Sequence, residues 1–259
     1  MLGAIAGDII GSVHEFQGEK ILDFPLFVEE STFTDDSVLT IAVADCLLTG
    51  SPYVEKFHEY TLTYPDRGYG GGFWQWVQSG SRAPYHSWGN GAAMRVSPVG
   101  FAFGSLEEVL YEAKLSAEVT HNHPEGIRGA QATATAIFLA RQGETKDEIR
   151  KAIQDRFNYN LSRTIEDIRP TYSFNESCQR TVPEAITAFL DSSNYEEAIR
   201  LAVSLGGDAD TLACIAGGIA EAFYGGVPRS IAERAMSMLD DKLRTIVNQF
   251  REVYMLSTD

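Results

Sequence analysis

The chain has 259 residues, 44% of them hydrophobic, and its 36 acidic side chains outnumber 21 basic ones, for a formal charge of −15 at pH 7. A surface with that charge repels a phosphate backbone, which argues against non-specific binding to nucleic acid. The hydrophobic content is enough for one large domain or two small ones. No linker or solenoid repeat divides the chain, so we expect a single domain over residues 1–259.

The first residues, "MLGAIAGDIIGSVHEF", have no basic start and reach Asp8 early, unlike a signal peptide. No stretch approaches the roughly 18 uninterrupted apolar residues of a membrane span. Cys46, Cys178 and Cys214 lack the spacing of a metal site and predict buried thiols in a reducing compartment. We therefore expect a cytoplasmic protein that does not bind membranes.

Helical periodicity dominates the chain and predicts an all-α fold. The segment "KILDFPLFV" is the single strand candidate, and Pro25 weakens it. Four longer irregular segments remain, and loops of such length are often functional: 15–34, 63–72, 79–91 and 157–177. The predicted helices are, in chain order, 2–14, 36–49, 53–62, 73–78, 92–102, 106–118, 124–142, 145–156, 178–190, 195–204, 209–224, 228–239 and 240–254.

Two predicted helices are rich in small residues, "GAIAGDIIGS" at 3–12 and "TLACIAGGIAEAFYGG" at 211–226. Glycine inside a helix costs about 1 kcal/mol relative to alanine, and the usual structural reason for it is close approach of a second helix. Both runs stand next to acidic residues, so close packing of the two helices would also bring those acids together.

The stretch "FTDDSV" at 33–38 places two adjacent carboxylates at the start of an apolar helix. One acid there caps free N–H groups and favours the helix dipole. A second adds repulsion of about 4 kcal/mol for charges about 4 Å apart at a dielectric near 20. The nearest bases in the chain are Lys20 and Lys56, more than ten residues away. The compensating charge is therefore either distant in sequence or not part of the protein.

A second pair of acids, Asp208 and Asp210, occurs in "LGGDADTLAC", again at the start of an apolar helix. Helix capping would explain either pair alone. Together they suggest converging hard oxygen ligands for Mg²⁺ or Mn²⁺, to which Thr34 and Thr211 could add oxygens. Neither cluster contains Cys or His, which disfavours zinc. The pair His121 and His123 also lacks an evident third ligand for zinc.

These motifs and their order resemble the ADP-ribosylglycohydrolase family, which includes ADP-ribosylarginine hydrolases and dinitrogenase-reductase-activating glycohydrolases. The resemblance covers nearly the whole chain and implies a compact, single-domain orthogonal helical bundle. It rests on six segments: "GAIAGDIIGSVHE" (3–15), "FTDDS" (33–37), "RGYGGGF" (67–73), "SWGNGAAMRVSPVG" (87–100), "TVPEAITAFL" (181–190) and "SLGGDADTLACIAGGIAEAFYG" (204–225).

Residue by residue, the resemblance implies a binuclear site for Mg²⁺ or Mn²⁺ whose ligands are Thr34, Asp35, Asp36, Asp208, Asp210 and Thr211. It implies that Glu15, Asp35 and Asp36 act in catalysis. It implies that one loop holds the diphosphate and that further residues surround ADP-ribose; in chain order these substrate-binding positions are Gly68, Tyr69, Gly70, Ser87, Gly89, Asn90 and His121.

The residues themselves support part of this assignment. Glycines in "RGYGGGF" let backbone N–H groups approach an anion without basic side chains. Arg67 and Arg95 are candidate counter-charges, although arginines in such places are more often structural or solvated. Asp8 lies on roughly the same helical face as Glu15 and either supports the metal site or caps a neighbouring helix, so it stays outside the predicted site. Candidate aromatic residues for stacking on adenine are Tyr69, Phe73, Trp76, Trp88 and Phe103.

We therefore predict a metal-dependent hydrolase that releases ADP-ribose from a mono-ADP-ribosylated protein or small molecule. Arginine is the preferred linkage, and the protein is expected to be a monomer. In this prediction the metals hold the distal ribose hydroxyls, Asp35 or Asp36 positions or deprotonates water, and Glu15 acts near the leaving group. Three alternatives remain: an ADP-ribosyl-serine hydrolase, a two-metal phosphohydrolase of nucleotides or diphosphates, and a non-catalytic ADP-ribose-binding protein.

Overall fold

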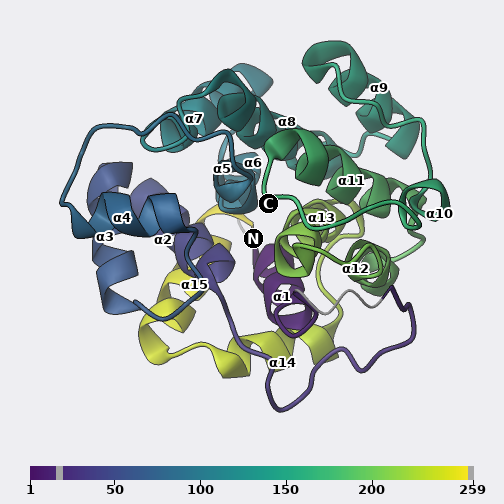
Figure 1. The fold of residues 1–259 in the computed structure, drawn as a ribbon, viewed down its shortest axis with the longest axis horizontal. Coiled ribbons are helices and arrows are strands. Elements are labelled where there is room, and N and C mark those ends of the chain that lie inside the picture. Colours follow the sequence, from purple (N-terminus) through teal and green to yellow (C-terminus); the bar gives the residue numbers. More distant parts are fainter. Residues whose placement is uncertain (16–19, 256–259) are drawn as a thin grey trace.

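The computed structural model describes residues 1–15 and 20–255, and all regular structure in those ranges is helical. The only β-type pairing within them is an isolated antiparallel bridge between Gly89 and Ser177, which confirms the all-α prediction. Figure 1 shows the helices crossing at steep angles around a central α13, with α1 beside it. No helix in these two ranges is both long enough and apolar enough to cross a bilayer.

The helices match most of the predicted segments. They are α1 (Leu2–Gly11), α2 (Asp35–Thr49), α3 (Tyr53–Thr63), α4 (Gly71–Gln78), α5 (Gly91–Met94), α6 (Ser97–Ala102), α7 (Leu106–Glu118), α8 (Pro124–Arg141), α9 (Lys146–Phe157), α10 (Ile165–Ile168), α11 (Cys178–Asp191), α12 (Tyr195–Val203), α13 (Ala209–Phe223), α14 (Arg229–Met238) and α15 (Asp241–Tyr254).

The predicted helix 92–102 is wrong as a single element, because it divides into α5 and α6 at Arg95 and Val96. Pro98 lacks the N–H group that would bond to the carbonyl of Met94, and it lies in the first turn of α6, where no such bond is needed. The carbonyl of Met94 instead accepts hydrogen bonds from side chains of α2 and α13.

Two further boundaries differ from the predictions. The segment 157–177 is not wholly irregular, since it contains the short helix α10, which begins with a capping box formed by Thr164 and Asp167. The first helix ends at Gly11 rather than at residue 14. Residues 12–15 form a turn in which Ser12 bonds back to the carbonyl of Ile9 at 2.9 Å.

The helix that contains "GAIAGDIIGS" packs along α13, as its small residues suggested. A Cβ atom added to Gly7 would lie 2.1 Å from the carbonyl oxygen of Ala213, and one added to Gly11 would lie 2.5 Å from the Cα of Asp210. Only glycine permits this backbone-to-backbone contact. The contact sets the end of α1, and the acids that follow it, against the start of α13.

The hydrophobic core is one continuous cluster drawn from nearly every helix. All three cysteines are free and buried, as predicted, and two of them belong to this cluster: Cys46 lies outside it, and Cys178 and Cys214 within it.

Candidate active site

The N-terminus of α2 is fixed by a buried acid of α1. Asp8 accepts hydrogen bonds from the backbone N–H groups of Thr34 and Ser37 at 3.0 and 3.1 Å, and from both of their hydroxyl groups. Thr34 in turn caps the helix through a bond from the N–H of Asp36 at 3.3 Å. Asp8 therefore satisfies the N–H groups that a helix start leaves unpaired, and it orients the Asp35–Asp36 pair.

The two acidic clusters meet at the N-termini of α2 and α13. Thr211 of α13 donates from its hydroxyl to Asp36 of α2 at 3.3 Å. The acidic side chains form two clusters, in each of which the carboxylate oxygens lie within 4.8 Å of one another. One cluster is Asp8, Asp36 and Asp210, the other is Glu15, Asp208 and Asp210, and Asp210 belongs to both. Side chains more than 170 residues apart in the chain are thus brought into one site.

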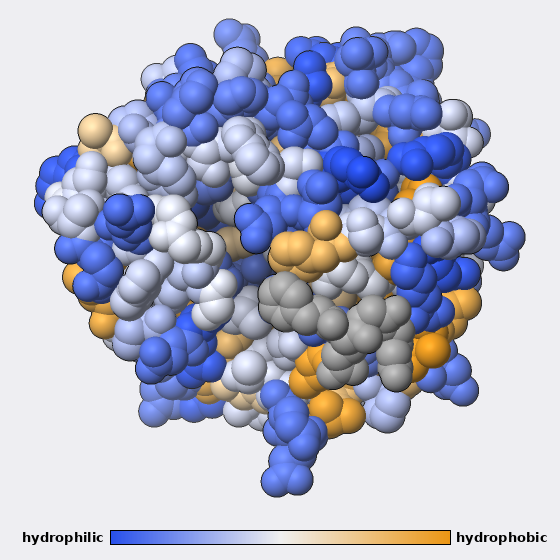
Figure 2. Space-filling view, in the orientation of Figure 1, coloured by the Kyte–Doolittle hydropathy of each residue, from blue (hydrophilic) through white to orange (hydrophobic). Residues whose placement is uncertain are grey.

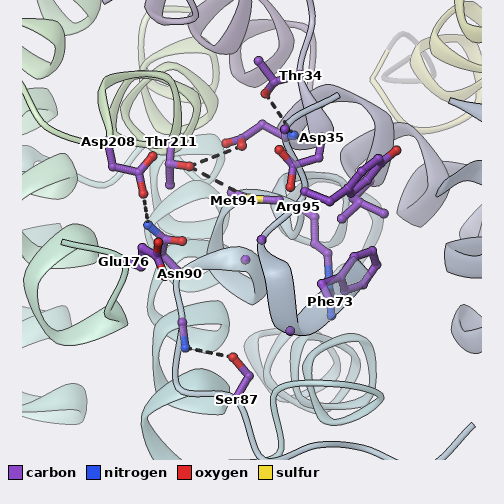
Figure 3. Close-up of a pocket in the computed structure, with 18 of the residues that line it drawn as sticks. Thr34, Asp35, Phe73, Ser87, Asn90, Met94, Arg95, Glu176, Asp208 and Thr211 are labelled. Atoms are coloured by element: carbon purple, nitrogen blue, oxygen red, sulfur yellow. Dashed lines mark hydrogen bonds between the residues drawn. The ribbon is translucent and has the colours of Figure 1, made fainter. Parts of the chain in front are cut away.

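Asn90 ties a third segment to these acids. Its side-chain amide donates to Asp208 at 2.6 Å and to Thr181 at 3.1 Å, and its backbone N–H donates to the carbonyl of Glu176 at 2.7 Å. The loop before α5 and the loop before α11 are therefore locked to the start of α13 (Figure 3).

Burial raises the pKa values of all these acids, and hydrogen bonds partly offset it for Asp8 and Asp208. Loss of hydration is the largest cause for Asp36 and Asp210, and the neighbouring carboxylates add to it. Asp35 is raised in the same way, first by burial and then by Asp8. For Glu15, burial followed by the charge of Asp208 raises the pKa to about 7. Without a cation, the site therefore retains protons that ordinary carboxyl groups lose.

Protein cations do not neutralise the cluster. None of the ion pairs formed by the described residues includes one of its acids. Arg67 is turned away: its guanidinium lies 3.7 Å over the ring of Phe33 and donates to Thr32 at 2.9 Å. One buried oxygen of Asp36, Oδ1, has no hydrogen-bond partner.

Arg95 is the one basic side chain in the cavity wall, and it is fully buried. Its guanidinium packs 4.2 Å from the ring of Phe57 and donates to Thr120 at 2.8 Å, while Nε and Nη1 have no partner. Thr120 also contacts Nδ1 of His121 at 2.7 Å. Burial, with a smaller effect from Arg95, holds the pKa of His121 well below its usual value, so this imidazole is neutral at pH 7.

Glycines line the cavity at the start of α4, where the loop before it passes close to Asp35. Gly68 has a positive φ of 86°, and a Cβ added to Gly70 or Gly71 would meet no atom within 4 Å. Four N–H groups at a helix start have no partner within the helix, and the dipole there favours a negative charge. The first turn of α4 is therefore suited to an anion, as the sequence predicted for this loop.

These elements surround a cavity of about 390 Å³. Figure 2 shows the molecular surface hollowed near the centre of the view, in the region between α4 and α13 of Figure 1. All predicted site residues line it: Glu15, Thr34, Asp35, Asp36, Gly68, Tyr69, Gly70, Ser87, Gly89, Asn90, His121, Asp208, Asp210 and Thr211. The structure thus brings them together around one cavity, although Asp35 belongs to neither of the two clusters of converging acids.

Several sequence interpretations need correction. Phe103 lines a second cavity, near the end of α15, so it cannot stack on a ligand in this one. Trp76 is buried behind the wall and donates to the carbonyl of Ala83 at 2.9 Å. Nδ1 of His123 accepts the N–H of Glu125 at 3.1 Å as the cap of α8, and among the described residues the pair with His121 gains no third metal ligand.

Sequence reasoning also missed residues of the site. The sequence left open whether Asp8 supports the metal site or caps a neighbouring helix. In the structure it caps α2 and also belongs to one of the two clusters of converging acids. Its signal was an acid in the middle of an apolar, glycine-rich helix. Tyr85, Phe174 and Glu176 line the cavity from loops, where no periodicity or motif marks them.

The chain belongs to the ADP-ribosylglycohydrolase family, whose model matches residues 1–258, and it is therefore a hydrolase of that family. Among individual relatives, ADP-ribosylhydrolase ARH3 of Homo sapiens is 27% identical over 87% of this chain and 84% of its own length. ADP-ribosylarginine hydrolase Tri1 of Pseudomonas putida is 24% identical over 90% of this chain and 72% of its own.

A solved structure shares the fold. The protein titled "ADP-ribosylglycohydrolase-related protein complex" superposes with a TM-score of 0.74 over 98% of this chain and 97% of its own, at 23% identity.

Proposed function

We propose that this hydrolase releases ADP-ribose from mono-ADP-ribosylated protein side chains, with the N-glycoside of arginine as the preferred linkage. The observation that carries the proposal is the meeting of two buried acidic clusters, from α2 and α13, in one cavity that the N-terminus of α4 also lines. Relatives named as ADP-ribosyl hydrolases support the class of substrate.

The site fits a pair of divalent cations. Its oxygens are the hard ligands that Mg²⁺ and Mn²⁺ prefer. No ion pair within the described residues includes one of its acids, and Oδ1 of Asp36 is buried without a hydrogen-bond partner. The residues that would hold the cations are Thr34, Asp35, Asp36, Asp208, Asp210 and Thr211. When bound, such ions orient ribose hydroxyls and polarise water.

The neutral and anionic parts of the substrate have separate anchors. The free N–H groups at the start of α4, with Gly68, Tyr69 and Gly70, suit the diphosphate without a basic side chain. The neutral imidazole of His121 faces the same cavity from the loop after α7, near Ser87 and Gly89. An acidic protein can in this way bind an anion through dipoles.

Cleavage of the glycosidic bond develops positive charge at the ribose carbon, which nearby carboxylates stabilise. We assign Asp35 or Asp36 to the positioning or deprotonation of water. Glu15 lies at the edge of the cluster and is only half-buried, so it can reach a leaving group. In the cation-free protein, burial and the charge of Asp208 raise its pKa to about 7, and bound cations would favour its ionised form.

The decisive experiment follows ADP-ribose release from peptides modified on Arg, Ser, Glu or Cys, with Mg²⁺ or Mn²⁺. We expect release from the arginine peptide, none after chelation, and near-complete loss in Asp35→Asn, Asp36→Asn and Asp210→Asn, each with weaker metal binding. Asp155→Asn, at an exposed position of α9, is the matched control. Products of phosphate and nucleotide would indicate a phosphohydrolase, and binding without hydrolysis a non-catalytic protein; either contradicts the proposal.

We further propose that the protein acts as a cytoplasmic monomer. Size-exclusion chromatography with light scattering tests the oligomeric state, and cell fractionation tests the compartment.

A further inference from the structure

A buried hydroxyl group lies between Arg95 and His121 at the cavity wall. Thr120, in the loop after α7, is fully buried, and its Oγ1 accepts a hydrogen bond from Nη2 of Arg95 at 2.8 Å. The same Oγ1 lies 2.7 Å from Nδ1 of His121. The imidazole of His121 has a part in the proposed function, whereas Thr120 has none so far.

The guanidinium of Arg95 decides how this hydroxyl group bonds. An arginine side chain only donates hydrogen bonds, whereas a threonine hydroxyl has one proton to donate and two lone pairs that accept. Arg95 is itself held firmly, because Nη2 also donates to the carbonyl of Ser116 at 3.0 Å and the guanidinium packs 4.2 Å from the ring of Phe57. One lone pair of Thr120 Oγ1 is therefore occupied by a group that cannot accept the hydroxyl proton.

The hydroxyl proton of Thr120 then has a single acceptor. Within residues 1–15 and 20–255, its Oγ1 has no polar contact besides Arg95 and His121. A proton on Nδ1 of His121 would leave the hydroxyl proton buried without an acceptor, which is costly. Nδ1 is therefore the acceptor. Burial holds the pKa of His121 well below its usual value, so the ring is neutral at pH 7 and its one proton lies on Nε2.

Nε2 is the ring nitrogen that faces the residues assigned to ADP-ribose. His121 lines the cavity, and its Nε2 has no hydrogen-bond partner in the part of the chain that the structure describes. A Cβ atom added to Gly91 would lie 3.0 Å from Nε2, and one added to Gly89 would lie 3.6 Å from it. Nε2 is thus beside the loop that carries Gly89 and Asn90. An N–H group at this place donates to a ligand oxygen, whereas an unprotonated nitrogen would repel it.

We propose that Thr120 is a positioning residue: it donates to Nδ1 of His121 and so presents Nε2–H to an oxygen of ADP-ribose. This inference rests on the proposed function, because it takes ADP-ribose as the ligand of the same cavity. The bond is made to the part of the substrate that all linkages share. Its loss should therefore raise KM for every linkage while kcat stays nearly the same.

Nitrogen-15 NMR of the Mg²⁺-loaded protein measures the tautomer directly. The ring signals of His121 are identified by their absence in His121→Gln. We expect the Nε2–H form in the wild type and a shift of the Nε2 signal when ADP-ribose is added. Thr120→Val, which replaces the hydroxyl with a methyl group, should give a mixture of both neutral tautomers. Thr120→Ser keeps the hydroxyl and should keep the Nε2–H form.

Affinity provides the second measurement. Thr120→Val should weaken ADP-ribose binding and raise KM for a modified peptide by about threefold to tenfold, the loss of one neutral hydrogen bond. kcat should change by less than about twofold, and Thr120→Ser should restore the affinity. The matched control is Thr135→Val, at a fully buried threonine of α8 whose hydroxyl has no partner among the described residues. It should change neither the tautomer nor the affinity.

The outcomes separate this inference from the proposed function. An Nδ1–H tautomer in the wild type, or an ADP-ribose affinity that Thr120→Val leaves within about twofold, overturns the inference even if modified peptides are cleaved. An equal loss of affinity in Thr135→Val does the same. The expected tautomer and loss of affinity support the inference even if no peptide is cleaved, a result that counts against the proposed function alone. If Thr120→Val does not fold, the wild-type tautomer and its response to ADP-ribose still decide.

Discussion

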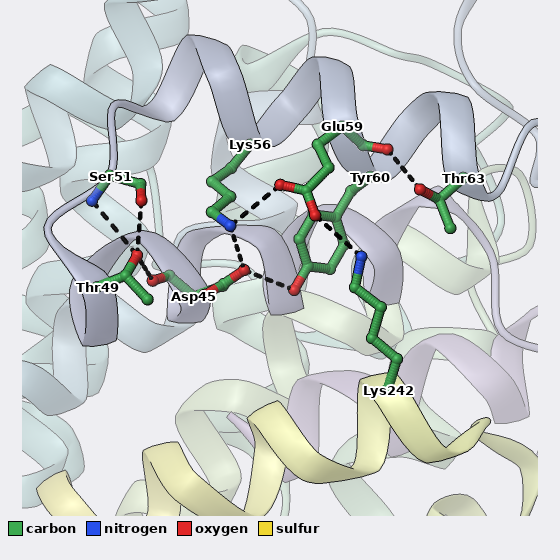
Figure 4. Close-up of polar contacts among 8 residues, drawn as sticks. All are labelled: Asp45, Thr49, Ser51, Lys56, Glu59, Tyr60, Thr63 and Lys242. Carbon is green, nitrogen blue, oxygen red and sulfur yellow. Dashed lines mark hydrogen bonds and ion pairs between the residues drawn. The ribbon is translucent and has the colours of Figure 1, made fainter.

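Replacing Asp36 by Asn is expected to stabilise the cation-free protein, whereas the same change at Asp45 should destabilise it. Both are buried acids of α2. Asp45 has a protein counter-charge: Lys56 lies 2.9 Å away, and the hydroxyl of Tyr60 donates to the same oxygen at 2.9 Å (Figure 4). Among the described residues Asp36 has no ion-pair partner: the hydroxyl of Thr211 donates to it at 3.3 Å, and it faces other carboxylates.

The magnitude follows from these surroundings. Two full charges within 4.8 Å of each other repel by at least about 3.5 kcal/mol at a dielectric near 20. Raised pKa values show that protons already relieve part of this repulsion at Asp36. We therefore expect Asp36→Asn to raise the free energy of unfolding of the cation-free protein by about 1–2 kcal/mol. A chain of this size gains about 2–4 °C in Tm per kcal/mol, hence about 2–8 °C.

At Asp45 the sign reverses. Removal of one partner leaves Lys56 paired with Glu59 alone and weakens the bond from Tyr60. Breaking a buried, hydrogen-bonded pair costs up to about 3–5 kcal/mol, and partial exposure of Lys56 reduces that figure here. We expect a loss of about 1–3 kcal/mol.

Thermal unfolding in EDTA and again in excess Mg²⁺ measures both effects. At a cation concentration of 100 times Kd, binding adds about 2.7 kcal/mol, or roughly 5–10 °C, to the wild type. Asp45→Asn should retain this increment, and Asp36→Asn should lose most of it. A cation-free Asp36→Asn that is less stable than wild type, or one that keeps the full Mg²⁺ increment, would refute the reasoning.

Three further outcomes follow from the same contacts. The pKa of Glu15 is about 7 in the folded protein, against 4.5 for an ordinary glutamate, so between these pH values the folded state holds a proton that the unfolded chain loses. The free energy of unfolding in EDTA should therefore fall as pH rises from about 5 to about 8. The fall should be shallower in Glu15→Gln and small in Mg²⁺. Asn90→Ala, which leaves Asp208 without its 2.6 Å donor, should lower the free energy of unfolding in urea by about 2 kcal/mol, and a loss under about 0.5 kcal/mol would contradict it. Gly7→Ala, which forces a Cβ into the backbone of α13, should cost about 3 kcal/mol or more by the same assay, whereas Gly104→Ala, with open space around it, should stay within about 0.5 kcal/mol.

Local signals in the sequence were enough for most helices. The capping box of Thr145 and Glu148 starts α9, and Asn194 caps α12 through the N–H of Glu197, as their spacing predicts. Where prediction failed, the deciding contact was not local. The break before α6 depends on Pro98 together with the side chains that bond the freed carbonyl from other helices.

The same division applies to the site. The paired acids at helix starts could be found in the sequence, because the repulsion between them follows from neighbouring positions in the chain and from the absence of a nearby base. Glu176 could not, because its place depends on a bond from Asn90, 86 positions earlier in the chain. The burial of Arg95 against Phe57 is equally a product of packing. Residues fixed by such tertiary contacts have no periodic signature.

The glycines of α1 link the fold to the chemistry. Positions 3, 7 and 11 recur every four residues, so they form one ridge of the helix, and each meets the backbone or side chains of α13 closer than a Cβ would allow. Close packing alone explains them, yet it also determines where the acids lie. Asp8 follows Gly7 on α1, and the Cα of Asp210 is the atom that a Cβ on Gly11 would strike. A larger side chain at any of the three would push the helices apart and separate Asp8 from Asp210, which belong to the same cluster of converging acids. Cation affinity should therefore fall together with stability in such variants, whereas a change in the core far from α1 would lower stability alone.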